Sequence, residues 1–269
     1  MAGLVSYICS FIFKTSSNRL SKYNLPLPLN CHLVLDDDVI GNRSVFVIGD
    51  VHGCYDELLE LLSLAESEEQ DRPILPVFVG DLINKGPKNA DVLQKIKSME
   101  AYAVRGNHDE AVLRQLLNRR NDPEYAFPPK YKWCKSLTDS DADFLTKLPY
   151  TISIPSCNAL VVHAGLVPGI PLENQDLTDM IVMRNVERKE DGSLKASEAH
   201  FVGEQWASKW PGPEHVYFGH DAVRGFQNFP FATGLDTGCL YGKELTGLFI
   251  NGCNKRISVK SQKVYRPPL

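Results

Sequence analysis

Three short apolar runs between residues 45 and 104 are each followed directly by a polar cluster. The runs are VFVI at 45–48, LPVFV at 75–79 and AYAV at 101–104, and the clusters are GDVHG at 49–53, GDLINKGP at 80–87 and RGNHD at 105–109. Apolar runs of this length are typical of buried strands in a parallel sheet. We therefore predict three strands, each with a polar cluster at its carboxyl end.

Amphipathic segments between and after these runs predict helices. Residues 55–66 and 89–99 place their leucines, valines and isoleucines on one side, and residues 110–117 continue the same pattern. Strands and helices thus alternate as β-α-β-α-β. Because ligands of open α/β sheets bind at the carboxyl ends of the strands, we expect the polar clusters to meet in one site.

The second half of the chain contains shorter apolar segments, at 151–154, 159–162, 216–218, 232–235, 245–250 and 257–259. We predict that all six form a second sheet. Two sheets with helices outside give the fold class α/β, as a four-layer α/β/β/α sandwich. The predicted division is an N-terminal extension at 1–40, one domain at 41–262 and a tail at 263–269. Charged residues at 187–200 indicate a surface excursion.

Composition narrows the functional classes. A chain of 269 residues with 43% hydrophobic content fits one large globular domain. A net charge of −4 predicts no extended nucleic-acid-binding surface, so a polyanionic substrate would depend on local cations. Seven cysteines without paired spacing indicate free thiols in a reducing compartment, and we expect a cytoplasmic protein. The sequence does not predict the oligomeric state.

The N-terminal segment leaves two alternatives open. Residues 1–30 contain no acidic residue, and their apolar run, from Leu4 to Phe13, is too short to span a bilayer, so no transmembrane segment is predicted. Its cations follow the apolar run, which is the wrong order for a secretory signal. The segment is compatible with an organelle transit peptide and equally with a strand or helix that packs on the domain.

The polar clusters contain the residue types of a metal site. Asp50 and His52 are two residues apart, Asp81 ends the next strand, and Asn107 and His108 follow the third. One such cluster by itself is usually only a strand-to-turn cap. Three at successive strand ends predict a mixed nitrogen and oxygen site, which suits a first-row transition metal better than Mg²⁺ or Ca²⁺.

Two further blocks complete a family resemblance. Together with His163-Ala164-Gly165 and Gly219-His220-Asp221, the three clusters resemble the signature blocks of the calcineurin-like metallophosphoesterases, in the phosphoprotein-phosphatase superfamily. The stretch at 235–248 is similar to the block that closes that domain. The ApaH-like phosphatases, relatives of the bacterial diadenosine tetraphosphatase, are the most similar group. The resemblance spans roughly residues 44–250 and implies that 41–262 is a metallophosphatase domain.

The resemblance implies two transition metal ions, Mn, Zn, Co or Fe, that activate a hydroxide for attack on phosphorus. The implied ligands are Asp50, His52 and Asp81 for one ion, and Asp81, Asn107, His163 and His220 for the other. His108 is then expected to be the general acid. The predicted substrate-binding residues are Asn84, Lys85, Arg105, Arg184 and Lys243, although Arg105 could equally tie down the loop around Gly106.

One departure from the family pattern bears on the substrate. Protein serine/threonine phosphatases usually have Asp-Arg-Gly where this chain has Asn84-Lys85-Gly86, so the carboxylate that orients the general acid is absent. We therefore predict hydrolysis of phosphoanhydrides in inorganic tri- or polyphosphate, dinucleoside polyphosphates or nucleotide caps. The alternatives are a serine/threonine protein phosphatase and a non-catalytic phosphate-binding module. The aromatic-rich segment at 118–133 either stacks on a nucleobase or covers the core.

Overall fold

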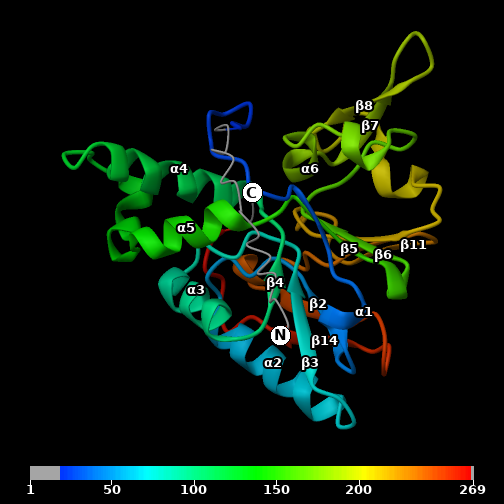
Figure 1. Cartoon of the computed structure of the whole chain (residues 1–269), viewed down its shortest axis with the longest axis horizontal. Helices are drawn as coiled ribbons and strands as arrows, with labels where there is room; N and C mark the ends of the chain where they lie inside the picture. Colours follow the sequence, from blue (N-terminus) through cyan, green and yellow to red (C-terminus); the bar gives the residue numbers. More distant parts are fainter. Residues whose placement is uncertain (1–18, 268–269) are drawn as a thin grey trace, which may run out of the picture.

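The computed structural model describes residues 19–267 and contains two main sheets (Figure 1). The first sheet has the strand order β14-β13-β2-β3-β4. Its strands are β2 (Ser44–Ile48), β3 (Ile74–Phe78), β4 (Tyr102–Ala103), β13 (Glu244–Phe249) and β14 (Arg256–Lys260). Strands β2, β3 and β4 pair in parallel, which confirms the three strands predicted between residues 45 and 104.

Strands β13 and β14 correct the sequence-based prediction, which placed both in the second sheet. They form an antiparallel hairpin, and β13 pairs with β2 so that Phe249 lies opposite Phe46. The two phenyl rings pack with their centroids 4.5 Å apart. This assignment depends on contacts between residues about two hundred positions apart, which no local pattern contains.

The second sheet has the order β1-β5-β6-β10-β12-β11. Its strands are β1 (His32–Val34), β5 (Thr151–Ile154), β6 (Ala159–Val162), β10 (His215–Phe218), β11 (Gln227–Phe229) and β12 (Ala232–Gly234). Strand β1 belongs to the predicted N-terminal extension, yet it pairs in parallel with β5. The domain boundary at residue 41 stays a prediction. The transit-peptide hypothesis concerns mainly residues 1–18, which lie outside the described part of the chain.

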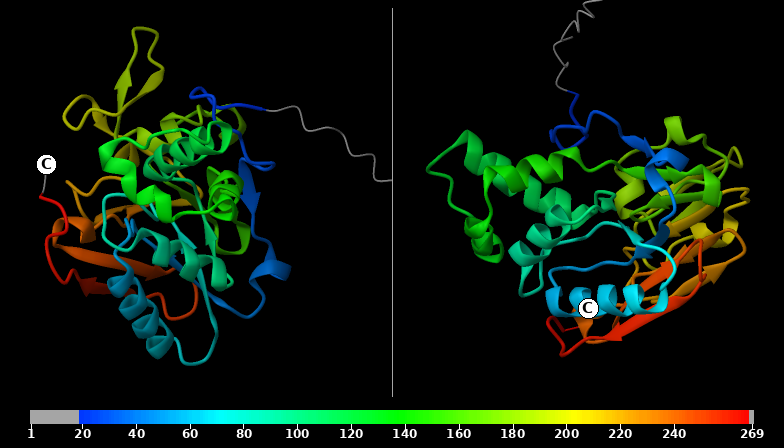
Figure 2. Two further views of the ribbon diagram at one scale, coloured as in Figure 1. Left: turned by 90° about the vertical axis from the view of Figure 1, so that its left-hand side faces the viewer. Right: turned by 60° about the horizontal axis from the view of Figure 1, so that its bottom comes forward.

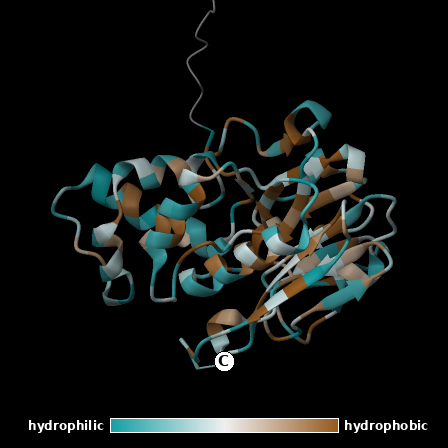
Figure 3. Cartoon of the chain, turned by 90° about the horizontal axis from the view of Figure 1, so that it is seen from below, coloured by the Kyte–Doolittle hydropathy of each residue, from teal (hydrophilic) through white to brown (hydrophobic). Residues whose placement is uncertain are grey.

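Four helices lie on the outer side of the first sheet: α2 (Tyr55–Glu68), α3 (Asn89–Ser98), α4 (Asn107–Asn121) and α5 (Asp139–Lys147). Helix α2 packs against β13 and β14, whereas α4 and α5 pack against each other and extend to one side of the sheet (Figure 2). Leucines and valines of the four helices form one hydrophobic cluster with the sheet residues Phe46, Ile48 and Phe78. The short helices are α1 (Asp37–Ile40) and α6 (Asp179–Val182), and the 3-10 helices are Pro129–Ser136, Pro155–Cys157, Leu172–Asn174, Trp206–Lys209 and Cys239–Tyr241. Figure 3 shows hydrophobic stretches along the strands and polar residues on the loops.

The two sheets face each other across a second cluster of buried aliphatic side chains, which includes Val45, Val77, Ile152 and Val161. This packing confirms the predicted sandwich. The outer face of the second sheet is covered by α6, the 3-10 helix Trp206–Lys209 and a small third sheet. That sheet consists of β7 (Asn185–Arg188), β8 (Leu194–Ser197) and β9 (Glu204–Gln205). The fourth layer therefore contains less helix than the sequence predicts.

The hairpin of β7 and β8 coincides with the predicted surface excursion, and it projects from the body of the molecule in Figure 1 and in the left view of Figure 2. The aromatic segment at 118–133 has the second of its two predicted roles. Helix α4 continues to Asn121, and Phe127 and Tyr131 are each only 8% exposed in the cluster beneath α4 and α5. Within residues 19–267, no helix is long and apolar enough to cross a membrane.

Candidate active site

All six predicted metal ligands come together where strands of both sheets end. Asp50 and His52 follow β2, Asp81 follows β3, Asn107 is the first residue of α4, His163 follows β6 and His220 follows β10. Ligand atoms of Asp81, His163 and His220 all lie within 4.8 Å of one another. A second group of the same size consists of His52, Asp81 and His108. Asp81 belongs to both groups and therefore joins the two halves of the site.

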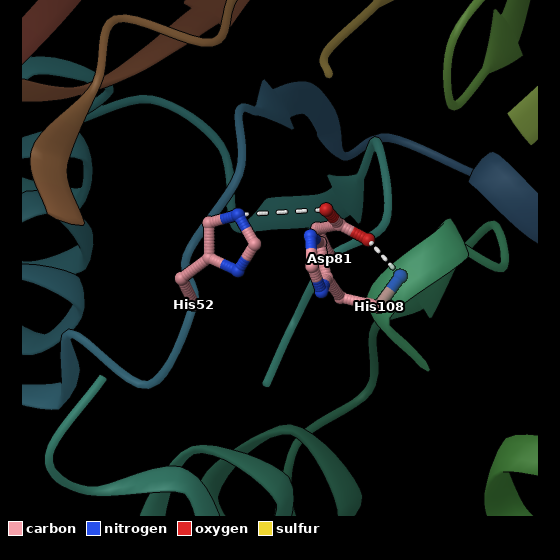
Figure 4. Close-up of side chains that lie close together, drawn as sticks. All are labelled: His52, Asp81 and His108. Carbon is pink, nitrogen blue, oxygen red and sulfur yellow. Dashed lines mark hydrogen bonds and ion pairs between the residues drawn. The ribbon is translucent and has the colours of Figure 1, made fainter. Parts of the chain in front are cut away.

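The Asp81 carboxylate contacts side chains and backbone on both of its oxygens (Figure 4). Its Oδ2 lies 3.4 Å from His52 Nε2, and its Oδ1 accepts a 2.9 Å hydrogen bond from the backbone nitrogen of His108. The same Oδ1 lies 3.4 Å from His163 Nε2. Asp50 is held separately, because the backbone nitrogen of His220 donates to both of its oxygens at 3.1 and 3.2 Å.

Two glycines of the motifs make room for these carboxylates. A Cβ atom on Gly106 would lie 2.1 Å from Asp81 Oδ1, and one on Gly219 would lie 2.0 Å from Asp50 Oδ1. Both distances are far below van der Waals contact, so any larger residue would displace the carboxylate. The glycines of GNHD and GHD are thus explained by close approach to the ligands.

Backbone carbonyl groups orient the two histidines from the second sheet. His163 Nδ1–H donates to the carbonyl of Val79 at 2.8 Å, and His220 Nε2–H donates to the carbonyl of Val182 at 3.0 Å. Each hydrogen bond fixes the tautomer, so that the other ring nitrogen carries a lone pair. In His163 this lone pair faces Asp81 Oδ1 at 3.4 Å and Asn107 Oδ1 at 3.1 Å.

The donor set therefore fits metal ions. The neutral His163 Nε2 and the two oxygens that it faces are all acceptors, and a cation between them would satisfy all three. Burial raises the pKa of Asp81 to about 7 and lowers the pKa of His163 to about 3. Burial likewise raises the pKa of Asp50 and lowers the pKa values of His52 and His220. Buried cations would favour the charged carboxylates and neutral imidazoles that metal binding requires.

His108 lies beside this cluster and contacts Asn84. The Asn84 side-chain amide donates to His108 Nδ1 at 3.0 Å, and the rings of His108 and His52 meet edge to face with centroids 5.0 Å apart. Burial, followed by the charge of Lys85, lowers the pKa of His108 to about 3. With Nδ1 as the acceptor, the remaining nitrogen Nε2 carries the proton.

A cavity of about 470 Å³ opens over the cluster, and three cationic side chains line it with the candidate ligands: Lys85, Arg184 and Lys243. Lys85 Nζ lies 3.5 Å from the Tyr241 hydroxyl, and Lys243 Nζ donates to the carbonyl of Ala222 at 3.1 Å. The buried Arg184 Nε has no hydrogen-bond partner among the described residues. Three of the predicted substrate-binding residues are therefore together at the site.

Arg105 is a correction to the predicted substrate-binding set. It is 0% exposed and lies outside the cavity. Its guanidinium donates to the carbonyl of Thr146 at 2.6 Å and that of Pro26 at 3.3 Å, and it lies 3.5 Å from Glu110 Oε1. Arg105 thus has the structural role that the sequence left open, because its side chain turns into the packing between α4, α5 and the N-terminal segment.

Sequence reasoning did not identify three other residues around the cavity: His200, Asp236 and Tyr241. Asp236 is only 6% exposed, and burial raises its pKa to about 7. Asp236 belongs to the Leu-Asp-Thr-Gly block. The resemblance of this block to the family could have identified it as a site residue. Asp109 was also missed. Its carboxylate accepts from the backbone nitrogens of Leu82 and Gly106 at 3.0 Å, so it holds the Asp81 loop against the start of α4.

A two-sheet sandwich with carboxylates and imidazoles gathered at the carboxyl ends of its strands defines a metallophosphoesterase. The cationic side chains in the same cavity agree with this class, because its substrates carry negatively charged phosphate. The chain belongs to the calcineurin-like phosphoesterase family, whose model matches residues 43–244. It is therefore a hydrolase of that family.

Relatives place the chain within the ApaH-like group. It is 27% identical over 223 residues to bis(5'-nucleosyl)-tetraphosphatase PrpE (asymmetrical) of Halalkalibacterium halodurans, which covers 75% of this chain and 88% of the relative. It is 29% identical over 279 residues to a symmetrical bis(5'-nucleosyl)-tetraphosphatase of Coxiella burnetii, covering 83% and 94%. A crystal structure named "putative diadenosine tetraphosphatase" matches with TM-score 0.73 and 36% identity, covering 86% of this chain and 97% of that one.

Proposed function

We propose that this protein hydrolyses phosphoanhydride bonds in substrates with several linked phosphates: dinucleoside polyphosphates, inorganic tri- or polyphosphate, or nucleotide caps. The observation that supports this most strongly is the shared cavity, in which Lys85, Arg184 and Lys243 lie with the candidate metal ligands. Cations at several points of one cavity match a chain of phosphates better than a single phosphate group. The dinucleoside tetraphosphatase names of the relatives favour the same substrate class.

Two transition metal ions, Mn, Zn, Co or Fe, are part of the proposal. Asp50, His52 and Asp81 would hold one ion, and Asp81, Asn107, His163 and His220 the other. Such a pair supplies a nucleophile at neutral pH and neutralises charge on the attacked and leaving oxygens. The mixed carboxylate, imidazole and amide donors suit first-row transition metals.

The side chains around the ligands would carry the remaining steps. Protonated His108 would give a proton to the leaving oxygen and return to the neutral imidazole, whose ring Asn84 holds. Lys85, Arg184 and Lys243 would grip phosphate oxygens, the arginine with two donors and the lysines as point charges. The buried Arg184 Nε, which has no partner among the described residues, is a donor available for this purpose.

Asn84 argues against a serine/threonine protein phosphatase. An amide can hold the His108 ring but cannot stabilise its protonated form as a carboxylate would. The phosphate group that leaves when a phosphoanhydride is cleaved needs less help from a general acid than the serine alkoxide that leaves from a phosphoserine. The retained ligand set and His108 likewise argue against a non-catalytic phosphate-binding module.

A substrate panel tests the proposal. The protein loaded with Mn²⁺, Co²⁺ or Zn²⁺ is incubated with diadenosine tetraphosphate, tripolyphosphate and a phosphoserine peptide, and the products are separated and quantified. We expect turnover of one or both phosphoanhydrides and little of the peptide. Turnover of the peptide alone would establish the protein phosphatase instead, and no turnover by the metal-loaded protein would favour the binding module.

Lys85→Ala tests the cationic cavity. Removing this charge should weaken hydrolysis of a long phosphate chain more than that of a small activated monoester, because the monoester makes fewer contacts with the cavity. The ratio of the two kcat/KM values measures the effect. Lys88→Ala is the matched control, since Lys88 is exposed and pairs with Asp56 outside the cavity. Equal losses on both substrates would show that Lys85 does not recognise chain length.

A further inference from the structure

A second cluster of metal-ligating residues lies on the chain segments that follow His52 and Asp236 and takes no part in the proposed reaction. It consists of Cys54, Glu57 and Cys239, whose ligand atoms all lie within 4.8 Å of one another. Cys54 directly precedes α2, Glu57 is the third residue of that helix, and Cys239 begins the 3-10 helix Cys239–Tyr241. Cys54 and Glu57 are 0% exposed and Cys239 is 1% exposed. Two segments that border the active site therefore meet at this cluster.

The carboxyl group of Glu57 is buried, and only one of its two oxygens is hydrogen-bonded within residues 19–267. Its Oε1 accepts hydrogen bonds from the Tyr265 hydroxyl at 2.8 Å and from the backbone nitrogen of Gln262 at 2.9 Å. Its Oε2 is buried and has no hydrogen-bond partner within residues 19–267. None of the ion pairs formed by residues 19–267 includes Glu57. A buried carboxylate without a cation costs several kcal/mol, of which the N terminus of α2 offsets only part.

We propose that Cys54, Glu57 and Cys239 form a binding site for one divalent, thiolate-preferring cation such as Zn²⁺ or Co²⁺. Two thiolates and a carboxylate are ligands that such ions take in structural sites. A cation between them neutralises the carboxylate and satisfies Glu57 Oε2. The C-terminal residues Gln262 and Tyr265 close the site and hold Glu57 in place.

The charge balance agrees with the position of the site. Two thiolates and one carboxylate carry three negative charges, so a divalent cation leaves a net charge of about −1 at the N terminus of α2. The helix dipole favours a negative group at that end. The bound ion would join the segment after His52 to the segment after Asp236, and thereby brace two loops of the cavity.

The sulfur ligands separate this site from the catalytic one. All candidate catalytic ligands are oxygen or nitrogen donors, so thiolate-to-metal charge transfer can arise only at cysteines. The full-length protein is prepared under a non-chelating reductant, stripped of metal and titrated with Co²⁺. We expect an intense near-ultraviolet thiolate band and about three bound ions per chain, two at the catalytic residues and one at the thiols.

Three variants locate the band: Cys54→Ser, Cys239→Ser and Glu57→Gln. The serine variants should lose the band and one bound ion per chain, and Glu57→Gln should weaken Co²⁺ binding at this site alone. Cys134→Ser is the control, since Cys134 is a buried free thiol outside the cluster, and it should keep the band. A titrated wild-type protein without a thiolate band would overturn the proposal, even if the serine variants failed to fold. A band that persists in both serine variants would overturn it as well.

Discussion

At the scale of single residues, the active site contains backbone conformations that most side chains avoid. His52, Asp81, Asn84, Lys85 and His220 all have positive φ angles, between 48° and 84°. Such conformations cost of order 1–3 kcal/mol each and persist only where the surrounding structure enforces them. Glycine would relieve the strain but would remove the ligand or the cation. Four of these side chains line the cavity and Asn84 holds His108, which a glycine could not do.

Asp81→Asn tests the shared ligand. An amide in place of the carboxylate removes the negative charge that lies between His52 and His163, so both metal sites should lose affinity and turnover should be abolished. Metal content after gel filtration, measured by mass spectrometry, checks the effect. Asp91→Asn, on the exposed side of α3, is the matched control. Full metal content and normal turnover in the Asp81 variant would refute the bridging role.

His108→Asn separates two roles for this histidine. As a general acid, His108 contributes roughly 10²–10⁴ in rate, so the variant should bind metal normally and hydrolyse slowly. A ring nitrogen of His108 also lies within 4.8 Å of the ligand atoms of His52 and Asp81, so these three residues could hold one ion together. Metal content and kcat are measured on the same sample. A loss of one metal ion would show that His108 is a ligand.

At the scale of elements, helix α5 depends on a network at its N terminus. Thr138 caps the helix, and the Asp141 carboxylate accepts from the backbone nitrogen and hydroxyl of Thr138 at 2.8 and 2.9 Å. Lys97 of α3 donates to the other oxygen of Asp141 at 2.7 Å. The network thus ties α5 to α3.

This network predicts a pH-dependent stability. Burial by itself would raise the pKa of Asp141, but the hydrogen bonds from Lys97 and Thr138 outweigh it and lower the pKa. The stabilisation is therefore present above the unfolded-state pKa of about 3.9 and is lost as the pH falls through the lower folded-state value. Asp141→Asn should cost about 1–3 kcal/mol at pH 7, and the difference from wild type should shrink below about pH 4.

Urea unfolding at a series of pH values measures the Asp141 effect. Asp139→Asn is a suitable control, because Asp139 is exposed and its contact with Arg120 lies at the surface. Surface ion pairs contribute little, so this control should change stability by less than about 1 kcal/mol. A difference between Asp141→Asn and wild type that stays constant from pH 7 into acid would contradict the assignment.

At the scale of the whole molecule, Arg105 and Arg184 have opposite roles. Arg105 connects the N-terminal segment, α4 and α5 through Pro26, Glu110 and Thr146. Arg105→Met should leave Glu110 buried without its cation and destabilise the fold by about 3–5 kcal/mol, with kcat/KM of the folded protein unchanged. Arg184→Met should lower kcat/KM and leave the stability of the fold unchanged, because Arg184 lines the cavity. Urea unfolding and kinetics on both variants make the comparison, and a phosphate-binding role for Arg105 would appear as a raised KM.

The local part of the fold and most of the site were predictable from the sequence. Apolar runs gave β2, β3 and β4, and the ligand residues follow strand ends in motifs that a family resemblance identifies. These features were predictable because each is encoded within a few neighbouring residues. A strand is encoded by its apolar run, and a close approach of backbone to carboxylate by a glycine such as Gly106. Their roles in binding metal stay predictions.

Only the tertiary structure decided which distant segments meet. It assigned β13 and β14 to the first sheet, turned Arg105 into the core, and brought Cys54, Glu57 and Cys239 together. None of these follows from local pattern, because a strand joins whichever sheet buries its side chains, and a long cationic side chain turns toward the nearest carboxylate and carbonyl groups. The sequence determined the chemical groups available to this protein, and the packing of its two sheets determined which of those groups share a site.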